Sequence, residues 1–165
     1  MNIHKHNTGK EEGYTPPKYI EAARKVMGSI DLDPASNEYA QQWVKAKKFY
    51  TKEDDGLSKD WQGNIWLNPP YSRGVVNQFV LTLVGSKYNS AIVLTNNSSE
   101  TSWGGTLLKY CSAVCFVKGR IKFITPDGEE GGKPLHGQMF TYFGTDVEKF
   151  KEEFSKFGTV FKGVA

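Results

Sequence analysis

The sequence predicts an α/β fold in which helices cover both faces of a β-sheet and an antiparallel hairpin comes late in the chain. Two apolar runs, residues 63–67 and 91–95, are continuous rather than alternating, as expected of strands that are buried on both faces. Segments with the apolar spacing of helices stand before, between and after these strands. Such an alternation of helices and buried strands is typical of a sheet covered by helices.

The first half of the chain is expected to hold two helices and a short strand ahead of the first buried run. Thr15 is suited to cap the first helix, with Pro16 at its first position and Gly28 at its end. The elements expected next are a short strand at residues 29–33, a helix at 37–47 and an acidic loop at 52–57.

The second half is expected to complete the sheet and to end in a helix. The elements expected after residue 71 are a helix at 76–85, the strand at 91–95, a helix around Trp103 and Leu107, and two strands at 113–124 and 138–143 joined by a glycine-rich loop. Thr145 and Glu148 have the spacing of a capping box for the last helix. We expect residues 1–14 to be a flexible arm and residues 15–165 to be one domain.

Composition narrows the class of protein. The chain has 165 residues, of which 38% are hydrophobic and 24% charged, so it is expected to be globular rather than disordered. A net charge of +3 is compatible with a nucleic-acid partner. Cys111 and Cys115 lack the spacing of a redox or zinc pair, and His4 and His6 lie on a polar arm, so we expect no metal site. No run is apolar and long enough for a leader or a membrane span, which favours the cytoplasm and no membrane partner.

The most informative motif is Asn68-Pro69-Pro70-Tyr71, which directly follows the first buried strand. The Asn68 side-chain oxygen and a carbonyl of Pro69 or Pro70 can accept both N–H bonds of an amino group attached to a heteroaromatic ring or a carbonyl. Such a nitrogen is a poor nucleophile, and holding both N–H bonds favours a lone pair that points at a methyl donor. Tyr71 offers a flat face for a flipped base. The alternative is a strand-to-turn junction with prolines as punctuation.

Two acidic clusters are candidates for holding a cofactor. Asp33, followed by Pro34 and Ala35, stands at the end of a predicted strand, where ligands bind in such sheets. It could accept hydrogen bonds from a nucleoside-like ligand or simply cap a helix, and its pairing with Asn68 favours the ligand. Asp55 could accept a hydrogen bond from the same ligand, although a solvated acidic turn explains it equally well.

A third cluster, Lys118, Arg120 and Lys122, would form a basic row on one face of the strand predicted at residues 113–124. Next to the glycine-rich loop, this row could bind phosphates and make binding sensitive to salt. The alternative is an edge strand protected from aggregation by its lysines.

The order of these motifs resembles the compact, phage-borne Dam-like DNA N6-adenine methyltransferases. The resemblance runs from Tyr14 to about Phe143 and is carried by the segments Tyr14-Thr15-Pro16-Pro17, Asp31-Leu32-Asp33-Pro34-Ala35-Ser36, Asp54-Asp55-Gly56-Leu57, Asp60-Trp61, Trp66-Leu67-Asn68-Pro69-Pro70-Tyr71 and Gly119-Arg120-Ile121-Lys122-Phe123.

The resemblance implies a Rossmann-like methyltransferase sheet that uses S-adenosylmethionine to methylate adenine at N6 in DNA, in the host cytoplasm if the protein is phage-borne. It implies a target amino group held by Asn68 and a prolyl carbonyl, and a base stacked on Tyr71. The cofactor pocket implied in the same way is formed by Thr15, Pro16, Asp33, Pro34, Ala35 and Asp55.

The chain departs from the wider methyltransferase class at its first cofactor motif. Ser36 and the two residues after it stand where that class has glycines, and no glycine follows before Gly56. Two other functions stay open. One is an N5-glutamine protein methyltransferase, which faces the same lone-pair problem but usually has a glycine-rich cofactor loop. The other is a non-catalytic nucleic-acid-binding module that kept the scaffold, which the missing glycines favour. The target sequence and the oligomeric state are not determined by these motifs.

Overall fold

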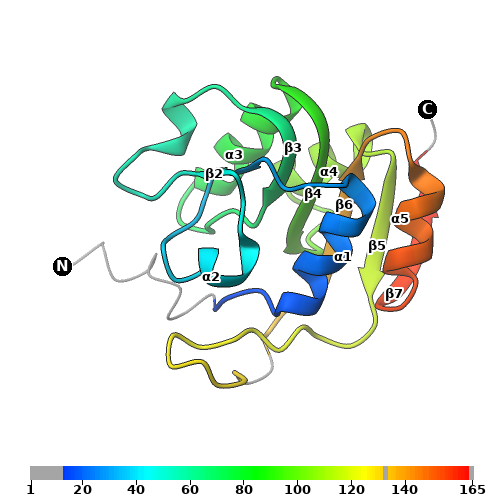
Figure 1. Ribbon diagram of the computed structural model, residues 1–165. Coiled ribbons are helices and arrows are strands. Elements are labelled where there is room, and N and C mark those ends of the chain that lie inside the picture. Colours follow the sequence, from blue (N-terminus) through cyan, green and yellow to red (C-terminus); the bar gives the residue numbers. More distant parts are fainter. Residues whose placement is uncertain (1–12, 132–133, 164–165) are drawn as a thin grey trace.

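A computed structural model describes residues 13–131 and 134–163 (Figure 1). The predicted arm at residues 1–14 lies outside the described residues except for Gly13 and Tyr14, and so do His4 and His6. The elements, in chain order, are α1 (Pro17–Met27), β1 (Leu32–Asp33), α2 (Gln41–Val44), β2 (Lys48–Phe49), the 3-10 helix η2 (Gly56–Ser58), β3 (Gln62–Leu67), α3 (Val75–Val84), β4 (Lys87–Asn96), α4 (Ser102–Tyr110), β5 (Ala113–Val117), β6 (Gln138–Phe143), α5 (Val147–Phe154) and β7 (Gly158–Lys162).

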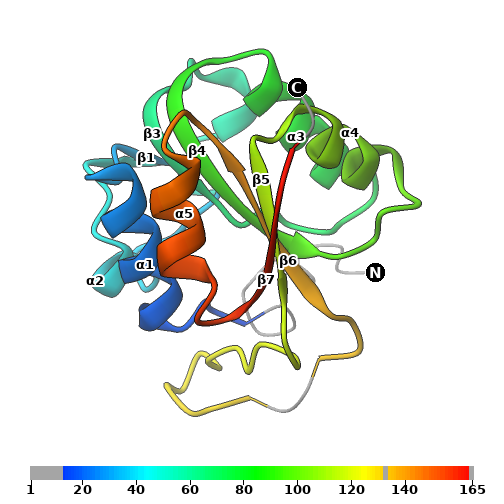
Figure 2. The ribbon, with the colours of Figure 1, turned by 90° about the vertical axis from the view of Figure 1, so that its right-hand side faces the viewer.

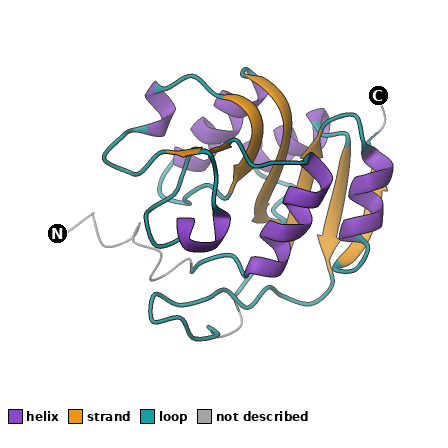
Figure 3. Cartoon of the chain, in the orientation of Figure 1, coloured by secondary structure: helices purple, strands orange, loops and turns teal. Residues whose placement is uncertain are grey.

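The strands form one seven-stranded sheet in the order β2-β1-β3-β4-β6-β5-β7. The pairs from β2 to β4 are parallel, and the pairs β4-β6, β6-β5 and β5-β7 are antiparallel. The mixed sheet, with its parallel half and its late antiparallel strands, confirms the predicted fold class and is consistent with a Rossmann-like methyltransferase (Figure 3).

Helices cover both faces of this sheet. Figure 2 shows α1, α2 and α5 on one side of the strands and α3 and α4 on the other. Each side has its own core: Ile20, Trp66 and Phe140 belong to the first, and Leu67 and Phe79 to the second. Trp66 and its neighbour Leu67 point to opposite faces, which explains why the β3 run is apolar without interruption. In the part of the chain that the structure describes, no helix is long and apolar enough to cross a membrane.

Several predicted boundaries are wrong. Pro16 is the N-cap of α1 without a side-chain cap, and Thr15 instead turns inward and is buried. Asp146, not Thr145, caps α5: its carboxylate accepts a hydrogen bond from the Lys149 N–H at 3.1 Å. Glu148 pairs with Lys162 on β7, a strand that the sequence did not indicate.

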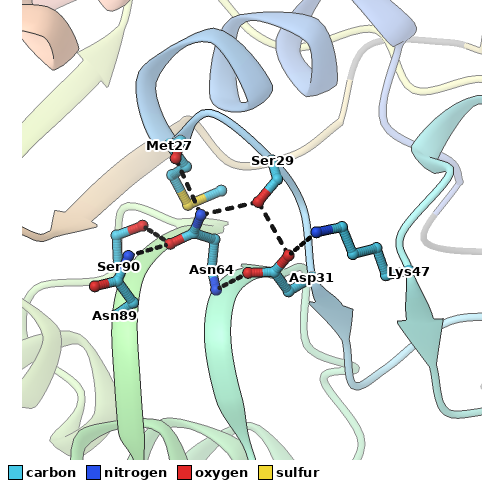
Figure 4. A network of polar contacts seen from close by, with 7 residues as sticks. All are labelled: Met27, Ser29, Asp31, Lys47, Asn64, Asn89 and Ser90. Atoms are coloured by element: carbon cyan, nitrogen blue, oxygen red, sulfur yellow. Dashed lines mark hydrogen bonds and ion pairs between the residues drawn. The ribbon is translucent and has the colours of Figure 1, made fainter.

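A buried amide joins the starting ends of the central strands to the end of α1. Asn64 on β3 is 7% exposed, and its Nδ2 donates to the Met27 carbonyl and to the Ser29 hydroxyl, both at 3.0 Å. Its Oδ1 accepts from Asn89 Nδ2 and Ser90 Oγ on β4, both at 2.8 Å. The amide therefore makes all four of its hydrogen bonds within the protein (Figure 4).

Asp31 extends this network toward β2. Its Oδ2 accepts from the Asn64 backbone N–H at 2.8 Å, its Oδ1 accepts from Ser29 Oγ at 3.0 Å, and Lys47 lies 3.2 Å from Oδ1. Figure 4 shows these contacts meeting at the ends of β1 and β3 where the strands start. The network fixes the strands at the end opposite to the motif that follows Leu67.

Truncation of Asn64 should be costly because four partner groups would each lose a hydrogen bond, three of them partly buried and the one from Ser90 buried. Asn64→Ala is expected to lower the free energy of unfolding by about 2–3 kcal/mol, mostly through the desolvation penalty of groups left unsatisfied. Urea unfolding measures this change. Gln78→Ala, an exposed site on α3, is the control and should change stability by less than about 0.5 kcal/mol. An equal effect of both variants would contradict the structural role of the network.

Candidate active site at the carboxyl ends of β1 and β3

A cavity of about 340 Å³ opens where β1 and β3 end. Its volume lies within the range of about 300–1,000 Å³ that is usual for small-molecule sites. Seven residues that the sequence singled out line this cavity: Thr15, Asp33, Pro34, Ala35, Asp55, Asn68 and Pro70. Pro16, Pro69 and Tyr71 are not among its lining residues. The two strand ends that the sequence predicted to lie side by side therefore share one cavity.

Asp33, the last residue of β1, is the buried acidic group of the cavity. It is only 2% exposed, its Oδ2 accepts from Gln41 Nε2 at 3.0 Å, and its Oδ1 has no hydrogen-bond partner among the residues that the structure describes. Burial raises the pKa of Asp33 to about 7, against the lowering effects of the Ser36 hydroxyl, the Ala35 N–H and the Gln41 amide. A buried acceptor without a partner, placed in a cavity wall, is a group that a ligand donor can satisfy.

Gln41 holds the Asp33 carboxylate in place from α2. Its Nε2 also donates to Ser36 Oγ at 2.8 Å, and its Oε1 accepts from the Ala46 N–H at 2.9 Å. The amide is thus satisfied on both sides, and its orientation is fixed toward Asp33. No motif pointed to Gln41, because its role depends on how α2 folds back against the end of β1.

Gly56 brings the acidic turn against the segment that follows Asp33. A Cβ atom at this position would overlap the Pro34 carbonyl oxygen, so only glycine allows the two backbones to come this close. The Gly56 carbonyl accepts from Trp61 Nε1 at 2.9 Å, which holds the turn against the core. Asp55, just before it, has a left-handed backbone with φ of 53° and lines the cavity. Gly56 thus lines the cavity next to Pro34, although it stands 22 positions later in the chain.

Tyr14 and Thr15 form another part of the cavity wall. Tyr14 exchanges two backbone hydrogen bonds with Ile124, each of 2.8 Å. The Thr15 carbonyl accepts from Trp43 Nε1 at 3.0 Å. Tyr14 and Trp43 also pack with Tyr39, with ring centroids 4.8 to 5.9 Å apart, and both line the cavity. Trp43 was not among the predicted site residues, although an aromatic residue in a short polar helix is a signal that could have indicated a site.

Asn68 stands at the end of β3 with its side chain on the cavity. Its Nδ2 donates to Thr15 Oγ1 at 3.2 Å. That contact uses the donor end of the amide and leaves Oδ1 as the acceptor end. Pro70 lines the same cavity two residues later.

Tyr71 lies beside the cavity and is anchored at its hydroxyl. The Asn96 N–H, at the end of β4, donates to Tyr71 Oη at 2.6 Å. The ring packs edge-on against Trp103 of α4, with centroids 5.9 Å apart. These contacts fix the plane of the ring next to the Asn-Pro-Pro-Tyr backbone. Stacking of a base on Tyr71 stays a prediction.

The basic row is not on a strand. β5 ends at Val117, and Gly119, with φ of 70°, breaks the extended backbone, so Lys118, Arg120 and Lys122 lie in a loop. In this loop Ile121 is buried and the three basic residues are exposed. The resulting alternation of basic and apolar residues resembles that of a strand, although the backbone is not one. Two of the three cations already hold the loop: Arg120 Nη1 donates to the Pro134 carbonyl at 3.0 Å, and Lys122 lies 3.4 Å from Glu130.

This loop reaches the cavity wall through Tyr14. Ile124 bridges to Tyr14 on one side and to Glu130 on the other, so that the segment 124–130 extends the wall formed by Tyr14 and Thr15. Figure 1 shows the loop, in yellow, beyond the ends of the strands and next to the start of the described chain. Leu135 in the same loop is 86% exposed. None of the three basic side chains lines the cavity, and the row that the sequence predicted is not formed.

An α/β sheet that carries an Asn-Pro-Pro-Tyr motif and a buried carboxylate on one cavity defines a candidate enzyme of the amino-methyltransferase class. The comparison with known families agrees: the family described as "DNA N-6-adenine-methyltransferase (Dam)" matches residues 4–162, and the chain belongs to it.

Two curated phage proteins are similar to this chain. A DNA N-6-adenine-methyltransferase of Haemophilus phage HP1 is 33% identical over 120 residues, which cover 69% of this chain and 66% of that protein. A DNA N-6-adenine-methyltransferase of Escherichia phage T1 is 28% identical over 142 residues, which cover 74% of this chain and 56% of that protein. The chain thus spans less than two thirds of the length of either relative.

Proposed function

We propose that this protein transfers a methyl group from S-adenosylmethionine to the N6 amino group of adenine in DNA. The observation that carries the proposal is a single cavity lined by Asn68 and Pro70 on one side and by the buried Asp33 on the other. An amino-methyltransferase needs this arrangement, because the acceptor nitrogen and the methyl donor must meet. The family and the names of the two phage relatives support adenine in DNA as the acceptor.

The residues of the cavity fit the proposed cofactor. S-adenosylmethionine carries an ammonium group, two ribose hydroxyls and an amino group, and each of these can donate to Asp33 Oδ1, which has no partner in the described part of the chain. The aromatic faces of Tyr14 and Trp43 offer apolar surface for a flat or cationic part of the same molecule. When bound, S-adenosylmethionine supplies an electrophilic methyl group and leaves as S-adenosylhomocysteine.

The chain itself supplies acceptors for the target amino group. Asn68 Oδ1 and the carbonyl of Pro69 or Pro70 would each accept one N–H bond, so that the lone pair of the nitrogen points into the cavity. Neither group is a base at neutral pH, and the proton released after transfer passes to water. Tyr71, with its ring fixed by Asn96 and Trp103, would stack on the base once it is flipped out of the duplex.

A radiolabelled-methyl assay that offers DNA, RNA and protein extract side by side tests this function. Label recovered as N6-methyladenine in DNA is the expected result. Label in protein would replace the proposal with the glutamine alternative. Absence of label together with absence of thermal stabilisation by S-adenosylmethionine would favour the non-catalytic module. A bound cofactor at a hundred times its dissociation constant should stabilise the fold by about 2.7 kcal/mol.

Binding of DNA through the loop that holds Lys118, Arg120 and Lys122 should be visible in how the affinity depends on salt. We expect Lys118→Ala combined with Arg120→Ala to weaken binding of duplex DNA and to reduce the slope of log K against log salt by about 1–2, because each lost phosphate contact removes nearly one unit. Fluorescence anisotropy over a salt series measures the slope. Lys87→Ala, an exposed lysine at the opposite end of the sheet, is the matched control and should leave it unchanged. An unaltered slope in the double variant would mean that Lys118 and Arg120 do not bind phosphates and that the loop has only a structural role.

A further inference from the structure

Thr15 has a position that its sequence motif does not explain. It precedes the first helix without capping it, is only 6% exposed, and presents its hydroxyl to the amide of Asn68 at 3.2 Å across 53 positions of the chain. A buried threonine hydroxyl that contacts the side chain expected to hold the substrate can act on how that side chain is oriented.

The orientation of the Asn68 amide matters because its two ends are chemically opposite. Oδ1 accepts hydrogen bonds, whereas Nδ2 only donates. The amino group of adenine is itself a donor, so a rotated amide would place a donor against a donor. The two orientations have the same shape, and neighbouring hydrogen bonds must therefore select between them.

We propose that Thr15 is a positioning residue for methyl transfer, whose hydroxyl holds the Asn68 side chain in place through Nδ2 so that Oδ1 meets the target amino group. A hydroxyl can donate as well as accept, so Thr15 fixes the place of the amide, and the N–H bonds of the target select its acceptor end. This inference rests on the proposed function. Because Asn68 Nδ2 is engaged at 3.2 Å by the hydroxyl, Oδ1 stays available as an acceptor. Thr15 itself does not touch the transferred methyl group in this role.

Thr15 can serve this role because its backbone is held on both sides. Tyr14 is paired with Ile124 through two hydrogen bonds of 2.8 Å, and the Thr15 carbonyl accepts from Trp43 Nε1 at 3.0 Å. Pro16 and Pro17 then restrict the backbone that leads into α1. A hydroxyl whose own position is fixed in advance can orient a neighbouring side chain without a further entropic cost.

Paired substitutions at Thr15 separate orientation from packing. Thr15→Val keeps the shape and removes the hydroxyl, and we expect a single-turnover methyl transfer rate about tenfold below wild type, as one lost hydrogen bond of typical strength implies. Thr15→Ser keeps the hydroxyl and is expected to stay within about twofold of wild type. The dissociation constant of S-adenosylmethionine, measured by calorimetry on both variants, should change by less than about twofold. A rate effect without an affinity effect is the mark of an interaction made at the reacting centre.

The Asn68→Ala background provides the second arm. Without the amide the Thr15 hydroxyl has no side chain to hold, so adding Thr15→Val to this background should change the remaining rate by less than about twofold. If the N68A background keeps the full tenfold effect, or if Thr15→Ser is as slow as Thr15→Val, the positioning role is wrong.

Two further outcomes separate this inference from the proposed function. An unchanged rate in Thr15→Val with a tenfold weaker cofactor affinity would make Thr15 a cofactor ligand only, and would overturn the inference while leaving the methyltransferase proposal standing. A wild-type protein that does not label DNA would overturn the proposed function itself. If Thr15→Val does not fold, Thr15→Ala measured in the wild-type and N68A backgrounds provides the same comparison.

Discussion

Asn68→Ala should reduce methyl transfer to DNA by about 10²–10³-fold, which is the usual loss when one preorganised polar group is removed from a transition-state site. The residue contributes the only side-chain acceptor of the Asn-Pro-Pro-Tyr motif that lies on the cavity. Without it, one N–H bond of the target amino group has no partner, and the lone pair stays delocalised into the ring.

Cofactor binding should survive this substitution. Asp33, the acceptor expected to meet the cofactor, is held by Gln41 on the other side of the cavity and does not depend on Asn68. The dissociation constant of S-adenosylmethionine in Asn68→Ala should therefore stay within about twofold of wild type. Asn77→Ala on α3 is the matched control and should keep full activity. Near-normal transfer by Asn68→Ala in the radiolabel assay would remove the residue from the mechanism.

Binding of S-adenosylmethionine should depend on pH through Asp33. In the free protein, burial raises the pKa of this carboxyl to about 7, so that it is largely protonated in mild acid. A ligand that donates to Oδ1 favours the carboxylate, and binding therefore lowers the pKa and releases a proton. Affinity should be full above pH 7 and should fall by about tenfold for each pH unit below it, until the pKa of the complex is reached.

The raised pKa of Asp33 makes the stability of the free protein depend on pH in the opposite direction. The folded pKa is higher than the unfolded one, so the contribution to stability is complete below the ordinary aspartate range and is lost as the pH rises through about 7. The cofactor should therefore stabilise the protein most in the pH range where the free protein is weakened by this group.

Asp33→Asn removes the ionisable group and keeps an acceptor oxygen. We expect the affinity at pH 8 to fall by about 10–100-fold, since a hydrogen bond to a charged group contributes about 1.5–3 kcal/mol, and the dependence on pH to vanish between pH 5.5 and 8. Isothermal titration calorimetry in buffers of different ionisation enthalpy measures both the affinity and the released proton. Asp60→Asn, at an exposed position, should retain the wild-type pH profile. A pH profile that persists in Asp33→Asn would assign the titration to another group.

The core of the fold could be predicted from the sequence because its strands are buried on both faces. Residues 63–67 and 91–95 are continuous apolar runs, and they became β3 and β4 at the centre of the sheet. The edges could not be predicted in the same way. β1 and β2 are each two residues long, too short for any periodicity, and β7 is mostly exposed. The strand predicted through residue 124 failed because Gly119 turns the chain while the alternation of side chains continues.

The residues of the candidate site could likewise be predicted only in part. Asp33 and Asn68 could be placed together because the carboxyl ends of neighbouring parallel strands meet at one edge of a sheet. Gln41 and Trp43 act through the way α2 packs against that edge, and no local pattern carries this information. Thr15 matched a motif, yet its partner Asn68 stands 53 positions later in the chain, and only the structure shows that the two side chains meet.

The close approach of Gly56 to Pro34 means that the pocket is built from two stretches of chain that come together only in the folded state. A molecule that contacts both of them would hold the two stretches together, and the segment between them, which includes α2 and β2, would open less often while the molecule is bound. Amide hydrogen exchange in that segment should therefore slow down on ligand binding, even at positions that the ligand never touches.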